Sequence, residues 1–192
     1  MAGHGYESGR LDLPFVGVAT FAKRPLVTEW AAIEADACIL GAPFDAGTQW
    51  RSGARFGPRA IREASTLFSF GHAGAYDHEE DKVYLGPEVR IVDIGDADVV
   101  HTLTEKSHAN IRAGVEAILD NGALAVTLGC DHSITIPAIA AYEGRESLHG
   151  GRLHVVQIDA HLDFVDERHG VRFGHGNPMR RAAEQPFVSG LS

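Results

Sequence analysis

The sequence predicts an α/β protein built on a mostly parallel sheet that is covered on both faces. Short apolar runs alternate along the chain with segments of helical spacing, and these runs are apolar almost throughout rather than at every second residue. Such strands are buried on both faces, as in parallel sheets flanked by helices. With 192 residues, 44% hydrophobic and 22% charged, the chain has the length and composition of one globular domain.

Four apolar runs are the predicted strands. They are residues 37–40, 89–94, 123–128 and 153–158. Gly41 and Pro43 end the first run, and Asp159 follows the last. Because ligands of such sheets bind beyond the carboxyl ends of the strands, the residues after each run are the first candidates for a site.

Helical spacing places three helices between these strands. The first begins at Gly57-Pro58, with proline at its first turn, the second covers residues 104–121, and the third runs from about Pro137 to Tyr142. Residues 1–35 are expected to form an irregular N-terminal arm. Residues 184–192 are expected to be a linker that leads towards a further strand.

Charge and composition narrow the classes of partner. The chain carries 17 basic and 26 acidic residues, a net charge of −9, without a block of Lys and Arg, which argues against a nucleic-acid or anionic-membrane surface. No run approaches the roughly 18 apolar residues of a membrane helix. Two cysteines are too few for a disulfide framework, so we expect a cytoplasmic protein.

Acidic and imidazole side chains follow the third and fourth predicted strands. Asp131 and His132 follow the third, and Asp159, His161 and Asp163 follow the fourth. In an extended segment residues i, i+2 and i+4 point to the same side, so these last three are expected to converge. Carboxylates and neutral imidazoles are ligands of divalent cations, so the pattern favours a metal site over a solvated polar loop.

Three further residues each have two possible interpretations. Asp131 is either the N-cap of a helix or a residue that does not bind the metal itself but orients one of its ligands. His175 lies between two glycines, which suits a proton shuttle, but a loop histidine without function has the same pattern. Cys130 is expected to be a small buried residue, with thiolate ligation as the alternative.

These motifs resemble those of the ureohydrolases, the family of arginases, agmatinases and related guanidino-acid hydrolases. Residues 129–133, Gly-Cys-Asp-His-Ser, match a Gly-Gly-Asp-His-Ser signature except for Cys130, and residues 159–163 match Asp-Ala-His-x-Asp in full. Residues 175–178 match His-Gly-x-Pro. Residues 41–45 and 57–62 are most similar to the agmatinase branch. The resemblance covers the chain from about residue 37 to its end.

The resemblance implies a three-layer α/β/α fold and two Mn²⁺ ions, with Ni²⁺ as the second choice. His132 and Asp163 would bind one ion, His161 the other, and Asp159 would bridge both. His175 would move protons or contact the substrate. A metal-bridging hydroxide would attack the guanidinium carbon, and agmatine would give putrescine and urea.

The family's third signature, which supplies two more aspartate ligands, is not found in the sequence. We therefore expect residues 1–192 to be one incomplete domain whose C-terminal part is missing, inactive alone and homo-oligomeric when full length. Guanidinobutyrate, guanidinopropionate and guanidine are alternative substrates. A pseudoenzyme or interaction subunit is the non-enzymatic alternative. A metal-dependent deacetylase shares the fold and an Asp-x-His pattern, but its tandem His-His pair is absent.

Overall fold

The central sheet is parallel, as the sequence predicts, but it has three strands rather than four. The computed structural model describes residues 13–145 and 150–192. Strand β1 (Ala37–Pro43) lies between β4 (Ile91–Asp96) and β5 (Leu124–Cys130) and is parallel to both. Five of its seven residues are fully buried, which explains its continuous apolar sequence.

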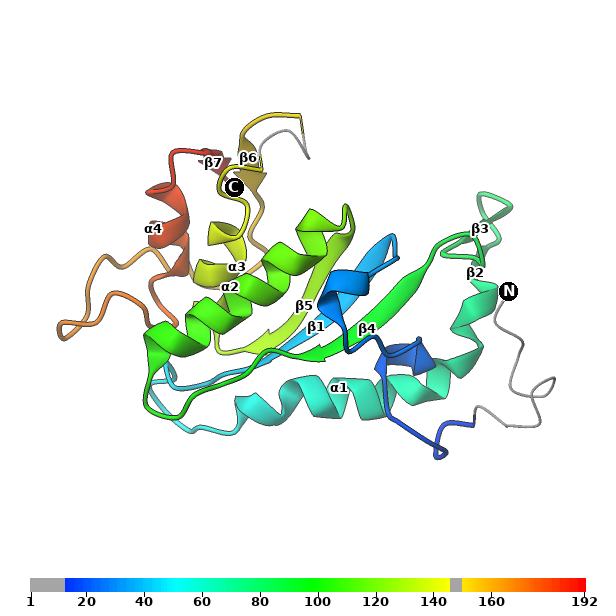
Figure 1. Cartoon of the computed structure of the whole chain (residues 1–192). Helices are drawn as coiled ribbons and strands as arrows, with labels where there is room; N and C mark the ends of the chain where they lie inside the picture. Colours follow the sequence, from blue (N-terminus) through cyan, green and yellow to red (C-terminus); the bar gives the residue numbers. More distant parts are fainter. Residues whose placement is uncertain (1–12, 146–149) are drawn as a thin grey trace.

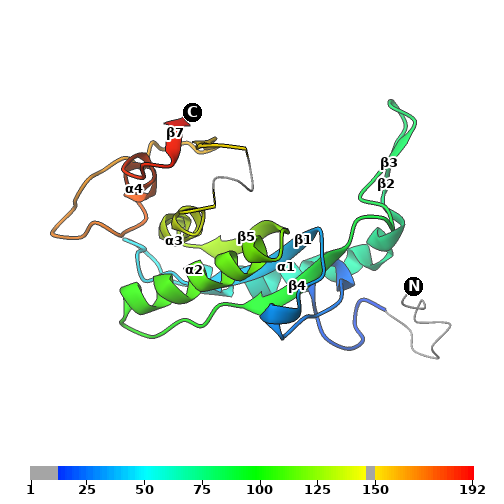
Figure 2. The same cartoon turned by 45° about the horizontal axis from the view of Figure 1, so that its top comes forward.

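Helices cover both faces of this sheet (Figures 1 and 2). Helix α2 (Thr104–Asp120) packs on one face so closely that a Cβ on Gly114 would lie 2.8 Å from Leu40 Cδ2. Helix α1 (Gly57–Ser65) packs on the other face, where Arg62 lies against Gly41. Alternate residues of β1 therefore face different helices, and the core lies mainly between α2 and the sheet.

The fourth predicted strand does not join the central sheet. Strand β6 (Leu153–Val155) is shorter than predicted and pairs in parallel with β7 (Val188–Leu191). The predicted linker at 184–192 was therefore wrong, because these residues contain a strand. The ladder stops where β7 ends, and Ile158, predicted to be buried in a strand, is 98% exposed.

The remaining elements are short and connect or flank these two sheets. Helix α4 (Pro178–Ala183) packs beside β7, and α3 (Thr135–Ala140) packs against α2 and α4 (Figures 1 and 2). An antiparallel hairpin, β2 (Ala75–Asp77) and β3 (Lys82–Tyr84), was not predicted, although its turn falls on the charged residues 78–81. No helix among the described residues is long and apolar enough to cross a bilayer.

The described part of the N-terminal arm packs against the body, and residues 1–12 lie outside the described residues. It contains two 3-10 turns, η1 (Phe21–Lys23) and η2 (Trp30–Ala32). The Phe21 amide donates to Asp93 Oδ2 at 2.8 Å, and Ile33 is part of the core. The arm is thus irregular, as expected, but it contributes to the core.

A candidate metal centre at the carboxyl end of β5

The chain turns sharply after β5, and Asp131 holds that turn. Asp131 caps the 3-10 turn η5 (His132–Ile134): its Oδ1 accepts a hydrogen bond from the Ser133 amide at 2.9 Å. Its Oδ2 accepts a second bond, from the Gly47 amide at 2.7 Å. The N-cap interpretation is confirmed, and the same carboxylate fixes the residue next to His132.

Three of the predicted ligands come together beyond the end of the strand. One ligand atom each from His132, Asp159 and Asp163 lies within 4.8 Å of the other two. His132 Nδ1 is 2.6 Å from Asp163 Oδ2 and 3.6 Å from Asp159 Oδ2. These side chains are only 16–28% exposed, so the two carboxylates share a small volume with one imidazole.

His161 lies on the other side of Asp159. Its Nδ1 is 3.3 Å from Asp159 Oδ1, and its side chain is 79% exposed. The His161 backbone amide donates to the same oxygen at 2.9 Å. This amide is the main reason why the pKa of Asp159 lies below its usual value, with the His161 and Gln157 side chains adding to the effect.

The backbone brings these residues together in a way that differs from the sequence argument. Residues 159–163 are not a strand, and Asp163 has a positive φ of 44°. A turn therefore directs Asp163 towards His132, whereas His161 stays outside the group formed by His132, Asp159 and Asp163. Strict alternation from i to i+4 does not describe this segment.

His175 is held by a backbone carbonyl of the loop that follows β1. Its Nδ1 lies 2.6 Å from the Gly47 oxygen, so Nδ1 carries the proton and donates it to that oxygen. The neutral ring then has its lone pair on Nε2. Gly47 thus contacts Asp131 through its amide and His175 through its carbonyl, and its Cβ position lies 2.8 Å from Asp131 Oδ1.

The donor set fits a divalent cation. Two carboxylates beside one imidazole repel each other unless a positive charge lies between them, and the imidazole nitrogen and carboxylate oxygens are suitable ligands for Mn²⁺, Ni²⁺ or Zn²⁺. Cys130 does not belong to the group; its Sγ contacts the Ala54 carbonyl, and burial raises the pKa of its thiol. It is half-buried rather than buried.

Sequence reasoning did not find a cavity that borders the loop carrying His175, and its lining does not include His132, Asp159 or Asp163. It has a volume of about 800 Å³ and adjoins the backbone on either side of His175. Its walls come from the loop after β1, the first turn of α2 and the loop before α4, and include Gly47, Gln49, Glu105, Arg168 and Arg172. These residues are far apart in the sequence, so no local sequence pattern predicts the cavity.

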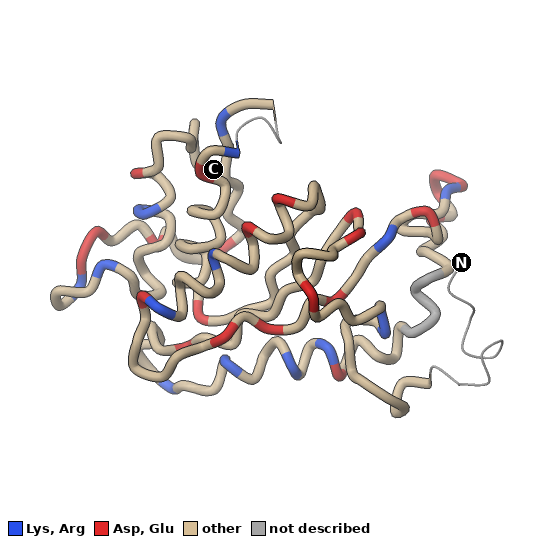
Figure 3. Tube along the Cα trace, in the orientation of Figure 1, with Lys and Arg blue, Asp and Glu red and all other residues tan. Residues whose placement is uncertain are grey.

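Charged residues of both signs line the cavity. Glu105 offers a carboxylate and Arg168 a guanidinium, and both are exposed. Figure 3 shows the acidic and basic residues of the loop before α4 at the left of the molecule. The cavity therefore has groups for either a cationic or an anionic end of a small molecule.

Comparison with known proteins places these features in one family. The family model described as the arginase family matches residues 35–191. Guanidinobutyrase from Pseudomonas aeruginosa is 34% identical over 182 residues, which are 94% of this chain and 54% of that protein. Mitochondrial agmatinase from Gallus gallus is 34% identical over 173 residues, 90% of this chain and 47% of that protein.

A solved structure supports the fold. The crystal structure of Trypanosoma cruzi formiminoglutamase with Mn²⁺ matches with a TM-score of 0.64 at 26% identity, covering 81% of this chain and 50% of that one. The predicted α/β fold is confirmed. The chain spans about half the length of the curated relatives it matches.

Proposed function

This chain belongs to the arginase family, and from that premise we propose that its complete gene product hydrolyses a guanidino compound to urea and an amine. The observation that carries the proposal is the group of His132, Asp159 and Asp163 at the carboxyl end of β5, with His161 on the other side of Asp159. Relatives of equal identity are named for hydrolysis of guanidinobutyrate and of agmatine, which supports the reaction class.

We propose that the centre holds two Mn²⁺ ions, with Ni²⁺ as the second choice. His132 and Asp163 would bind one ion, His161 would bind the other, and Asp159 would serve both. Oxygen-rich ligation with imidazole favours these metals, and the Trypanosoma cruzi relative contains Mn²⁺. When bound, such ions supply the Lewis acidity that makes water a nucleophile near neutral pH.

The chain's own residues would provide proton transfer and orientation. With Nδ1 donating to the Gly47 carbonyl, His175 can accept a proton at Nε2 and return it to the departing amine. Asp131 would orient His132 through the turn that it caps.

Agmatine is the proposed substrate, and guanidinobutyrate is the second candidate. The Glu105 carboxylate in the cavity suits the ammonium end of agmatine, whereas Arg168 suits a carboxylate. Urea release from agmatine, guanidinobutyrate, guanidinopropionate and guanidine should decide between them. Glu105→Gln should raise KM for agmatine if agmatine is the substrate. Arg168→Ala should raise KM for guanidinobutyrate if guanidinobutyrate is the substrate.

The metal assignment has its own measurement. Elemental analysis of the complete gene product, purified without added metal, should find manganese. Zinc as the sole metal in fully active protein would overturn the manganese assignment. Nickel as the metal would instead support our second choice.

Two further parts of the proposal concern the protein's setting. We propose a cytoplasmic location, which the two free cysteines support, and a homo-oligomer of the complete product. Fractionation of cells and light scattering of the purified protein test these two points.

A further inference from the structure

The segment between Asp163 and His175 is a loop whose two ends lie together. The Val165 amide donates to the Gly176 carbonyl at 3.1 Å, which closes the base of the loop. Its tip turns through His169 and Gly170, and Arg168 pairs with Val171 across this turn. A candidate metal ligand and the candidate proton shuttle therefore lie at opposite ends of one closed loop.

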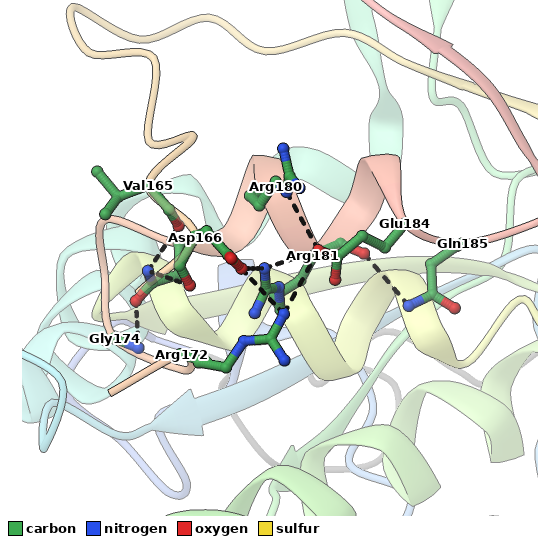
Figure 4. A network of polar contacts seen from close by, with 9 residues as sticks. Val165, Asp166, Arg172, Gly174, Arg180, Arg181, Glu184 and Gln185 are labelled. Atoms are coloured by element: carbon green, nitrogen blue, oxygen red, sulfur yellow. Dashed lines mark hydrogen bonds and ion pairs between the residues drawn. The ribbon is translucent and has the colours of Figure 1, made fainter. Parts of the chain in front are cut away.

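Asn177 ties these two ends to each other with its side chain. Its Nδ2 donates to the Val165 carbonyl at 2.7 Å, and its Oδ1 accepts from the Gly174 amide at 2.9 Å. Figure 4 shows these bonds running to Val165 and Gly174. Asn177 is only 3% exposed, so its own end of both bonds lies away from solvent.

Helix α4 fixes the position of this clamp. Asn177 directly precedes α4, and the Met179 amide in its first turn donates to the Asp163 carbonyl at 3.1 Å. One turn later the buried Arg181 pairs with Asp166 of the loop and, at 2.8 Å, with Glu184 (Figure 4). The loop base is therefore anchored to a helix rather than held by its own bonds alone.

We propose that Asn177 is a positioning residue that sets Asp163 and His175 in their places relative to each other. Two of its three side-chain bonds end within two residues of one of them, since Val165 is two residues after Asp163 and Gly174 is directly before His175; the third, at 3.4 Å, goes to the Asp166 carbonyl. Without the side-chain amide, the Val165 carbonyl and the Gly174 amide lose this partner and the loop ends are free to separate. The consequence for the metal rests on the proposed function.

The first test is the affinity of the purified chain for Mn²⁺, measured by calorimetry with Asn177→Ala beside the unsubstituted protein. We expect the dissociation constant to rise about 10-fold or more, as for partners that orient a ligand. A merely structural role would lower the unfolding temperature and leave the Mn²⁺ affinity of the folded protein unchanged. That result would overturn the proposal.

Gln185→Ala is the matched control. Gln185 is also an amide close to α4, and its Nε2 donates to the Arg181 carbonyl at 3.2 Å rather than to the loop (Figure 4). We expect it to leave the Mn²⁺ affinity unchanged. An equal loss in both variants would show that any perturbation of α4 suffices, and would overturn the specific role of Asn177.

A second variant covers the case in which Asn177→Ala does not fold. Asn177→Asp keeps the shape and the acceptor for the Gly174 amide, but replaces the donor to Val165 with a charged oxygen. The added negative charge by itself would attract Mn²⁺. Weaker binding in this variant therefore supports the clamp, and unchanged or tighter binding contradicts it.

Hydrogen exchange separates failure of the clamp from failure of the proposed function. If the unsubstituted chain binds no Mn²⁺, the metal proposal for these residues fails, and amide exchange of residues 164–174 decides the clamp alone. We expect faster exchange in Asn177→Ala than in Gln185→Ala. Equal exchange in the two variants overturns the clamp whatever the metal does.

Discussion

At the scale of single residues, Asp45 makes stability depend on pH. Its buried carboxylate accepts bonds from the Gly53 amide at 2.6 Å and from Arg55 Nε at 2.6 Å, and chiefly the Arg55 side chain lowers its pKa to about 2. The folded pKa lies below the unfolded value, so the stabilisation is complete above about pH 4 and disappears as pH falls through 2.

Asp45→Asn should therefore lower the free energy of unfolding at pH 7 and lose that difference on acidification. Urea unfolding at several pH values measures it, with Asp77→Asn, on the exposed hairpin, as the control. A difference that persists unchanged at pH 2 would contradict the assigned ion pair.

Asp159 and His175 should give different losses when each is replaced. Asp159→Ala should abolish urea release and Mn²⁺ binding together, because both proposed ions use its carboxylate. His175→Ala should keep the metal and lower turnover by about 10²- to 10⁴-fold, the usual contribution of a positioned proton-transfer group. Loss of metal in His175→Ala would refute the shuttle role.

The candidate metal ligands could be predicted from the sequence, but the residues that hold those ligands in position could not. His132 and Asp159 follow apolar runs, which marked them as candidates, but Asp159 reaches His132 through the loop after β6 and not through the edge of one sheet. Gly47 and Asn177 hold the site through backbone groups of distant segments. Their sequence neighbourhoods carry no signal of those contacts, since the partners depend on how the loops fold back.

At the scale of elements, the junction between β5 and η5 sets the place of His132. A Cβ on Gly129 would lie 2.0 Å from Ile134 Cδ1 and 3.2 Å from Ala42 Cβ, so Gly129→Ala must displace the Ile134 side chain of η5 and crowd Ala42. We expect a loss of about 1–3 kcal/mol in the free energy of unfolding, the usual effect of overpacking, with weaker Mn²⁺ binding.

Gly57→Ala is the control for that substitution. A Cβ on Gly57 would meet Cys130 Sγ at 3.5 Å, an ordinary contact, although Pro58 disfavours the helical backbone for a residue with a Cβ directly before it. Denaturant unfolding should show a smaller loss of stability for Gly57→Ala than for Gly129→Ala. Equal losses in the two variants would contradict the role assigned to the junction.

Elements with a local pattern were predicted well, and elements that depend on a distant partner were not. Helix α2 begins at Thr104, as predicted, because its apolar spacing and the glycine at 122 are local signals. Strand β7 was missed because Val188–Leu191 becomes a strand only by pairing with β6. The same dependence explains why residues 156–158, apolar like a strand, have no ladder.

At the scale of the whole molecule, the site joins two parts of the fold. His132 follows the central sheet, whereas Asp159 and Asp163 follow β6 in the smaller sheet. The contacts that connect these two parts of the fold include the 2.6 Å bond between His132 and Asp163 and the bond from His175 to Gly47. A cation bound by this group would therefore cross-link the two sheets in the folded state only.

Binding of Mn²⁺ should accordingly raise the unfolding temperature of the chain. An ion at 100 times its dissociation constant adds about 2.7 kcal/mol to the free energy of unfolding. For a chain of this size each kcal/mol raises the midpoint by about 2–4 °C, so we expect a rise of about 5–11 °C in a thermal scan. EDTA should reverse it.

The variant that tests this cross-link is His132→Ala, because it removes the only ligand of the three-residue group that follows the central sheet. Asp159 and Asp163 would then hold a cation within the smaller sheet and its loops, with no tie to β5. At a fixed Mn²⁺ concentration the thermal rise should fall to a small fraction of its full value, because the two remaining ligands hold the ion more weakly. A full rise in His132→Ala would mean that the ion stabilises the loop after β6 alone and that the two sheets are not coupled through it.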